Sequence, residues 1–275
     1  MDNGENGKKS LNWKRGEIPH FPSRDEFCIK YTNANVGVYP GIFPGVANNA
    51  GSGSVPTSLL FLSRNLSENR AWVYRNSDYP NRISYLMEDQ AQQLYQEGSV
   101  FFKNGHYPEA LASCNKALAI RPDYADAWNG RGVALAELKQ PAEAFAAYDK
   151  ALAIRPDYAD AWINRGWALV ELGRDEEAVE SYDKGLALNP DDASAWFIRG
   201  AELGILGRHT EALASFDKSI AINPDDAYAW NFRGVALHEL GRYAEAITSY
   251  DRAIAINPDY AEVKLNRKLA LKKQM

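Results

Sequence analysis

Small and apolar residues recur through the later two thirds of the chain with the four-then-three spacing of one face of an α-helix. In one copy of this pattern Trp128 is followed by Gly132 and then by Leu135. The tryptophan column continues with Trp162, Trp196 and Trp230, the glycine column with Gly166, Gly200 and Gly234, and the leucine column with Leu169, Leu203 and Leu237, and a less regular earlier copy has Leu94, Gly98 and Phe101. A glycine on this face lets a second helix approach closely, which offsets a loss of helix propensity of about 1 kcal/mol. The pattern therefore predicts one helix in each copy, packed against another.

A second helix is predicted in each copy from an alanine followed four residues later by an aromatic residue, as in Ala144 and Tyr148. A left-handed glycine is expected to end the first helix, at Gly105, Gly173, Gly207 and Gly241, and Lys139 replaces it in the second copy. A proline ends the second helix every 34 residues, at Pro122, Pro156, Pro190, Pro224 and Pro258. The aspartate after each proline is the expected N-cap of the next helix: Asp123, Asp157, Asp191, Asp225 and Asp259.

A fixed period of this length indicates a stack of copies of one small unit. The columns (tryptophan, glycine, leucine, alanine, aromatic, small residue, proline) closely resemble those of the tetratricopeptide repeat (TPR) family. The resemblance covers five repeats, at 91–124, 125–158, 159–192, 193–226 and 227–260, with a capping helix at 261–273. It implies an all-α fold, a right-handed TPR solenoid of five helix–turn–helix repeats plus the C-terminal capping helix, over residues 87–275. It further implies that the first helices line a concave groove.

Two charged columns vary together between the copies. Arginine stands at Arg131, Arg165, Arg199, Arg233 and Arg267, and aspartate at Asp149, Asp183, Asp217 and Asp251, while the first copy has Glu97 and Asn115. Pairing each aspartate with the arginine of the next repeat leaves no aspartate without a partner. We therefore predict an Arg–Asp ladder between adjacent repeats, from Asp149–Arg165 to Asp251–Arg267, that holds their register. The alternative is that these charges lie on solvated faces, where a surface pair contributes only about 0–1 kcal/mol.

The residues one, two and five positions after each tryptophan are expected to face the groove, from helical geometry and from the TPR resemblance. The predicted partner-binding residues are Ile163, Asn164, Trp167, Phe197, Ile198, Asn231, Phe232 and Val235, within an acidic rim of Asp126, Glu137, Asp160, Glu171 and Glu239. Large apolar side chains on a face not used for stacking favour binding. The combination fits an extended peptide or an amphipathic helix with apolar anchors and basic residues, and Trp167, Phe197 and Phe232 are the expected anchors. The alternative is that some of these side chains contact neighbouring helices and are partly buried.

A two-carboxylate clamp, by which some TPR proteins hold the acidic C-termini of heat-shock chaperones, is not supported by the sequence. The chain has Asn129 and Asn164, but Tyr95, Ile163 and Phe197 stand where basic residues would help. Acidic peptides of that kind are therefore not the expected ligands.

The net charge is −5, and the acidic excess falls in the repeats, which disfavours nucleic acid as a partner because its binding needs clustered positive charge. Two cysteines imply neither a disulfide framework nor a thiolate metal site, and the four histidines do not cluster at metal-ligand spacing. No phosphate-binding loop or nucleophile elbow occurs, so no catalytic residue, metal or cofactor is expected. The polar first twenty residues do not form a signal peptide, and the longest apolar run is too short to span a bilayer. A cytoplasmic location without membrane association is expected.

These observations favour a non-enzymatic scaffold that binds one or more proteins or peptides in the concave groove. The alternative is a substrate-recruiting or regulatory arm of an enzyme complex. Self-association by end-to-end stacking is disfavoured, and a monomer is expected, because basic residues charge the last helix: Lys264, Arg267, Lys268, Lys272 and Lys273.

Residues 1–86 do not repeat and are dense in Gly, Pro, Asn and Ser. An irregular, largely disordered segment is the main expectation, with a small independent domain or partial docking on the first repeat as alternatives. Phe27 to Tyr31 and Ser58 to Leu62 are candidate short strands. Met87 leads directly into the first repeat, and we hypothesise that translation also starts there.

Overall fold

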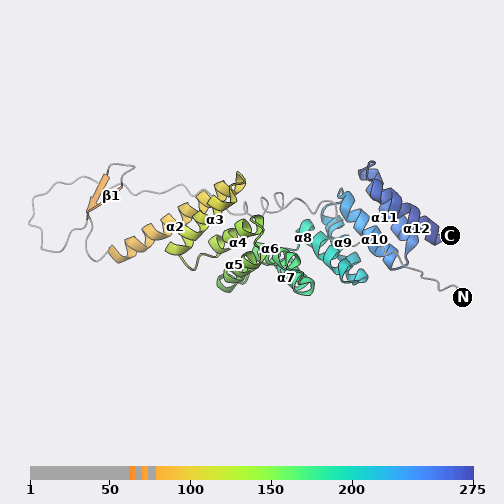
Figure 1. Cartoon of the computed structure of the whole chain (residues 1–275), viewed down its shortest axis with the longest axis horizontal. Helices are drawn as coiled ribbons and strands as arrows, with labels where there is room; N and C mark the ends of the chain where they lie inside the picture. The colour runs from red at the N-terminus through yellow and green to blue at the C-terminus, as the bar shows by residue number, and fades with distance from the viewer. Residues whose placement is uncertain (1–61, 66–69, 74–78) are drawn as a thin grey trace, which may run out of the picture.

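A computed structural model describes residues 62–65, 70–73 and 79–275, and within them helices dominate. The first helices of the repeats are α2 (Tyr79–Lys103), α4 (Ala125–Glu137), α6 (Ala159–Glu171), α8 (Ala193–Ile205) and α10 (Ala227–Glu239). The second helices are α3 (Tyr107–Ile120), α5 (Pro141–Ile154), α7 (Asp175–Leu188), α9 (His209–Ile222) and α11 (Tyr243–Ile256), and α12 (Ala261–Gln274) follows. Two short strands, β1 (Leu62–Asn65) and β2 (Arg70–Val73), pair antiparallel ahead of the helices, with Leu62 opposite Val73. Figure 1 shows the helix pairs in a row along the long axis of the molecule, so the predicted solenoid of five hairpins and a last helix is confirmed.

Each second helix packs both on the first helix of its own repeat and on the first helix of the next. First helices of adjacent repeats also contact each other, at α2–α4, α4–α6 and α8–α10, more than adjacent second helices do, and α10 contacts α12 in the same way. Because the first helices approach one another more closely, they form the inner side of the array. We call the surface that they present the inner face.

The glycine column allows the helices of one repeat to pack closely. A Cβ atom added to Gly132 would lie 2.5 Å from Cε1 of Tyr148, and one added to Gly166 would lie 2.7 Å from Cε1 of Tyr182. The aromatic ring of the second helix therefore rests on the backbone of the first. The same arrangement recurs at Gly200 with Phe216 and at Gly234 with Tyr250.

Tryptophan and proline recur together because they are hydrogen-bonded. In four copies the indole Nε1 donates to the carbonyl oxygen of the proline just before the helix, at 2.8 Å: Trp128 to Pro122, Trp162 to Pro156, Trp196 to Pro190 and Trp230 to Pro224. Each bond fixes the start of a first helix against the end of the preceding second helix.

The turns between the two helices of a repeat are as predicted. The four turn glycines have φ angles of 73° to 74°, and Lys139 adopts the same left-handed conformation with φ at 61°. After α6 the amide of Gly173 donates to the Val170 carbonyl at 3.1 Å and that of Arg174 to the Leu169 carbonyl at 2.9 Å. These two bonds are those of a Schellman motif, which requires a residue with positive φ.

The predicted N-caps are wrong by one residue. Each first helix after α2, and α12 as well, begins at an alanine, so its N-cap is the second residue after the proline: Tyr124, Tyr158, Asp192, Asp226 and Tyr260. Side-chain capping occurs in two copies, where Asp192 accepts from the amide of Ala195 at 3.0 Å and Asp226 from that of Tyr228 at 2.8 Å. The aspartate directly after each proline lies outside the helix.

Helix α2 begins at Tyr79, ahead of both Met87 and the first repeat residue, Ala91. The interval 79–86, which we expected to be irregular, is therefore helical. Pro80 lies in the first turn, where a proline does not interrupt the hydrogen bonds of a helix. The candidate strand at Phe27 to Tyr31 lies outside the described residues, and the one at Ser58 to Leu62 overlaps β1 only at Leu62.

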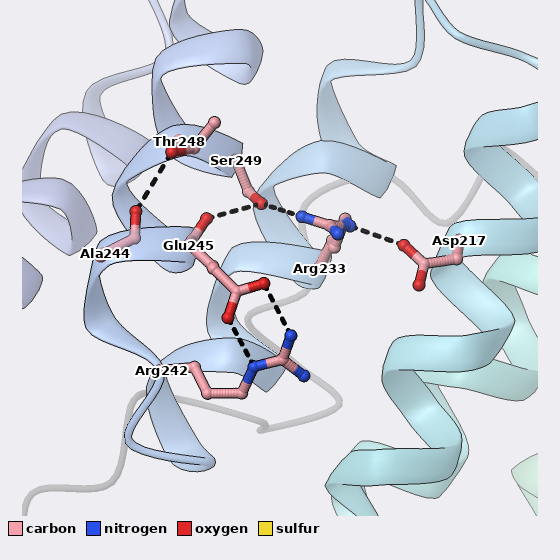
Figure 2. Close-up of polar contacts among 7 residues, drawn as sticks. All are labelled: Asp217, Arg233, Arg242, Ala244, Glu245, Thr248 and Ser249. Atoms are coloured by element: carbon pink, nitrogen blue, oxygen red, sulfur yellow. Dashed lines mark hydrogen bonds and ion pairs between the residues drawn. The ribbon is translucent and has the colours of Figure 1, made fainter.

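The Arg–Asp ladder is confirmed at all four predicted positions. Arginine Nε donates to aspartate Oδ1 at 2.5 to 2.7 Å in Asp149–Arg165, Asp183–Arg199, Asp217–Arg233 and Asp251–Arg267. Figure 2 shows one rung, in which Arg233 of α10 lies between Asp217 of α9 and Ser249 of α11. Three of these arginines also donate to a serine of the following second helix: Arg165, Arg199 and Arg233. Each of the three therefore joins the second helices of two adjacent repeats.

Candidate functional site

The structure buries seven of the eight predicted partner-binding side chains. Ile163, Ile198 and Asn231 are wholly buried, Asn164, Phe197 and Phe232 are 3% exposed, and Val235 is 4% exposed. Only Trp167 keeps a partly exposed side chain, packed against the core of the later repeats. The expectation that all eight form an exposed groove floor is therefore wrong, and the alternative, that such side chains pack on neighbouring helices, applies to seven.

Two aromatic anchors, Phe197 and Phe232, belong to a cluster that joins the fourth and fifth repeats. The ring of Phe197 lies edge-on to that of Phe232, with centroids 5.5 Å apart, and both rings pack on Phe216 of α9. Truncating a buried phenylalanine to alanine typically costs about 3–5 kcal/mol. A Phe197→Ala variant would therefore test stability rather than binding.

Ile163 fills a space left by a missing side chain. Gly185 of α7 lies in a column where the other repeats have alanine or serine. A Cβ atom added to Gly185 would lie 2.7 Å from Cγ1 of Ile163. The larger side chain on α6 therefore compensates for the smaller residue on α7.

The buried asparagines form two matching hydrogen-bonded groups. Asn164 donates to Oδ1 of Asn129 at 3.1 Å, and Asn129 donates to the Tyr158 hydroxyl at 3.4 Å. Near the C-terminus Asn266 donates to Asn231 at 3.2 Å, and Asn231 donates to the Tyr260 hydroxyl at 3.4 Å. These amides bond to one another across adjacent repeats, as buried polar groups generally must.

A sequence signal for this burial exists. Residues 35 positions apart are of the same type where adjacent first helices meet: Asn129 and Asn164, Ile163 and Ile198, Phe197 and Phe232, Asn231 and Asn266. We call these the matched pairs. Direct contacts join three of them, so the match reflects apolar packing on apolar and amide bonding to amide across the repeat boundary.

Of the predicted acidic rim, Glu239 is partly exposed on α10, and the other four carboxylates lie with Trp167 on α4 and α6. Asp160, Trp167 and Glu171 are seven and then four residues apart, so they lie along one side of the helix. Asp126 and Glu137 occupy the corresponding positions on α4. Glu171 is exposed and the other four are partly exposed. We call these five residues the inner acidic patch.

The two aspartates of the patch differ in their surroundings. Asp126 accepts from Nη2 of Arg155 at 2.5 Å, and the guanidinium of Arg155 lies 3.6 Å from the ring centroid of Tyr158. Within the described part of the chain, Asp160 has no such bond to an arginine. Burial raises the pKa of Asp160 to about 6, since the opposing field of Arg155 does not outweigh it and the charge of Asp126 adds to it.

A small apolar pocket lies between the first two repeats, lined by Tyr95, Phe102, Cys114 and Val133 among others. Cys114 stands where the other repeats have an aromatic ring. Burial raises the pKa of its thiol to about 12, so the sulfur is a neutral thiol at physiological pH.

Within residues 62–65, 70–73 and 79–275, no three His, Cys, Asp or Glu side chains gather closely enough to hold a metal ion. None of the described helices combines the length and the apolar character that a membrane-spanning helix needs.

Comparison with known families matches two models, both described as tetratricopeptide repeat, one over residues 95–159 and 202–261 and the other over 135–198. The chain belongs to the tetratricopeptide repeat family. No significant match is found among curated protein sequences.

Solved TPR structures share the fold. YrrB, described as a TPR protein with an unusual peptide-binding site, is 26% identical with a TM-score of 0.60, over 69% of this chain and 97% of YrrB. MamA (41-end) from Desulfovibrio magneticus RS-1 is 18% identical with a TM-score of 0.58, over 63% of this chain and 98% of that one. A tetratricopeptide repeat protein from Parabacteroides merdae is 21% identical with a TM-score of 0.58, over 68% of this chain and 74% of its own. This TPR chain therefore shares its architecture with solved TPR proteins, one of which is described as having a peptide-binding site.

Proposed function

We propose that this TPR array binds an extended peptide segment of another protein along the inner acidic patch. An apolar side chain of the peptide packs on Trp167, and basic side chains approach the surrounding carboxylates. The observation that carries the proposal is that Trp167 alone, of the predicted anchors, remains accessible, with Asp160 and Glu171 on the same side of its helix. Aromatic side chains are favoured as binding hot spots, and charge complementarity steers the partner. The peptide-binding site described for YrrB supports the same use of the fold.

Selection of peptides from a random library on the intact chain tests this function. Peptides that bind the parent are expected to lose at least about tenfold in affinity for Trp167→Ala, since a buried aromatic contact contributes about 2 kcal/mol or more. The matched control is Leu188→Ala, which truncates a 45% exposed apolar side chain at the end of α7. Peptides that lose affinity for Leu188→Ala but not for Trp167→Ala would place binding on the second helices and refute the proposal.

We further propose that the protein is non-enzymatic, cytoplasmic and monomeric, and that its partners are neither nucleic acids nor membranes. The inner acidic patch repels phosphate groups, which supports a protein partner.

The last helix exposes Lys264 and Lys268 but also two leucines one turn apart, Leu265 at 56% and Leu269 at 40% exposure. Sedimentation at increasing concentration is expected to give one monomer mass. A mass that rises, and that Leu265→Lys restores to the monomer value, would replace the monomer with end-to-end association.

A further inference from the structure

The edge of the inner face carries an ion pair that is complete in one repeat and incomplete in the next. Asp126, in the first turn of α4, is paired with Arg155, 29 residues later in the chain. The equivalent positions one repeat on are Asp160 and Asn189, so the carboxylate is kept and the arginine is missing. One repeat further the equivalents are Ser194 and Asn223, and both charges are gone. The chain thus provides its own comparison between a paired carboxylate and one that lacks the equivalent arginine.

Asp160 lies close to charges that do not neutralise it. The two charged groups that act on it are Arg155 and Asp126. Arg155 is already bonded to Asp126 at 2.5 Å and stacked on Tyr158 at 3.6 Å, so its guanidinium is held toward the neighbouring repeat. Burial therefore dominates at Asp160 and disfavours its charged form. A cation that arrives at this carboxylate meets a group whose solvation has already been partly removed.

We propose that Asp160 is the docking site for an arginine side chain of the bound peptide, whose guanidinium takes at Asp160 the place that Arg155 takes at Asp126. The inference rests on the proposed function, because it assigns one contact of that peptide. Arginine is favoured over lysine because a planar guanidinium can donate two parallel hydrogen bonds to one carboxylate, whereas an ammonium group cannot.

The geometry of α6 also sets the spacing of the peptide. Asp160 and Trp167 lie seven residues apart on one side of the helix, which at about 1.5 Å per residue is about 10 Å. An extended chain covers about 3.3 Å per residue, so this separation corresponds to about three residues. The bound segment is therefore expected to carry an arginine about three positions from an apolar anchor.

An arginine supplied by the chain itself tests the geometry without any ligand. In Asn189→Arg the missing partner is restored, and the titration midpoint of the Asp160 carboxyl, followed by NMR, is expected to fall by about one pH unit or more. The matched control is Asn223→Arg, whose equivalent partner position is Ser194 and which is expected to leave that midpoint unchanged. An unchanged midpoint in Asn189→Arg would show that an arginine cannot reach Asp160 in this way and would overturn the inference.

The binding test uses peptides selected on the intact chain, each remade with its arginines replaced by citrulline, which keeps the shape and removes the charge. For the parent chain, citrulline peptides are expected to bind about tenfold more weakly than arginine peptides. For Asp160→Asn and for Asn189→Arg the two peptide forms should bind alike. If citrulline peptides bind the parent chain equally well while Trp167→Ala still weakens both forms, the arginine site is refuted and the peptide-binding function stands. If Trp167→Ala also has no effect, both fall.

Discussion

At the scale of single residues, Asp160 is expected to destabilise the folded chain at neutral pH. An acid with a raised pKa in the folded state favours folding while it is protonated, and this contribution is lost as pH rises from about 4 to about 6. We therefore expect Asp160→Asn to raise the free energy of unfolding at pH 7.5 by roughly 1 kcal/mol, allowing for solvent screening of a partly exposed group, and to change it little near pH 4. Urea denaturation at both pH values measures the difference.

Asp126→Asn is the control, and it should destabilise the folded chain at pH 7.5 because it removes the partner of Arg155. An equal gain for Asp160→Asn at both pH values would rule out ionisation as the cause.

Lys139 has the only positive φ of a non-glycine residue in the described part of the chain. A side chain in the left-handed region costs about 1 kcal/mol relative to glycine, and the other four turns avoid this cost. We expect Lys139→Gly to raise the free energy of unfolding by about 0.5–1 kcal/mol, seen as a higher urea midpoint at unchanged slope. Lys139→Ala is the control, since it removes the same charge but keeps the strained Cβ. A gain from alanine as large as that from glycine would attribute the effect to charge.

At the scale of secondary-structure elements, the ladder predicts a weak boundary between the first two repeats. The first repeat has Asn115 where the others have aspartate, and the second has Ala147 where the others have the bonded serine. Arg131 accordingly has a buried Nε atom without a hydrogen-bond partner. The helices α3, α4 and α5 therefore meet without the bonds that join the equivalent helices of later repeats.

Restoring that rung should stabilise the boundary. We expect Asn115→Asp to raise the free energy of unfolding by about 0.5–1 kcal/mol, the range for a partly exposed ion pair, with less gain at high salt. A double-mutant cycle with Arg131→Met supplies the control, because the gain should vanish when the arginine is absent. The same gain in the presence and absence of Arg131 would mean that Asn115→Asp acts through something other than the ladder.

The ladder and the helix pairs could be predicted from the sequence because the repeats serve as comparisons for one another. The first repeat has Asn115 in the aspartate column, so the ladder pattern lacks the rung to Arg131. In the structure the Nε atom of Arg131 is accordingly left without a hydrogen-bond partner. The burial of the inner face does not follow from equivalent positions in the same way, because its signal joins residues 35 positions apart rather than 34. Helical geometry gives the direction of Phe197 but not the distance to the next first helix, and that helix brings Phe232 within 5.5 Å. Trp167 remains accessible although its helical position is equivalent to that of Val235, which is buried.

At the scale of the whole molecule, the contacts between helices are almost entirely between neighbours. From the second repeat onward, each boundary carries a matched pair and a ladder rung, and the principal contacts among the described helices join no early repeat to the last one. Stability in such an array is close to a sum of repeat and boundary terms, so a change at one end acts mainly on that end. The inner acidic patch lies on α4 and α6, within the early half of the array, and a disturbance of the last repeat should leave it intact.

Removal of α12 tests this independence, because that helix covers the last repeat. Val263 and Ala270 are wholly buried, Asn266 donates to Asn231, and Arg267 forms the last rung with Asp251. In a chain without residues 261–275, we expect amide hydrogen exchange in α10 and α11 to accelerate at least about tenfold, while α4 to α7 keep the rates of the intact chain. Peptide affinity at Trp167 should also be kept.

A control chain that lacks only residues 272–275, which are exposed, should match the exchange rates and the peptide affinity of the intact chain. Acceleration spread evenly over α4 to α11 would instead show that the array unfolds as one cooperative unit, and the peptide site would then depend on its distant end.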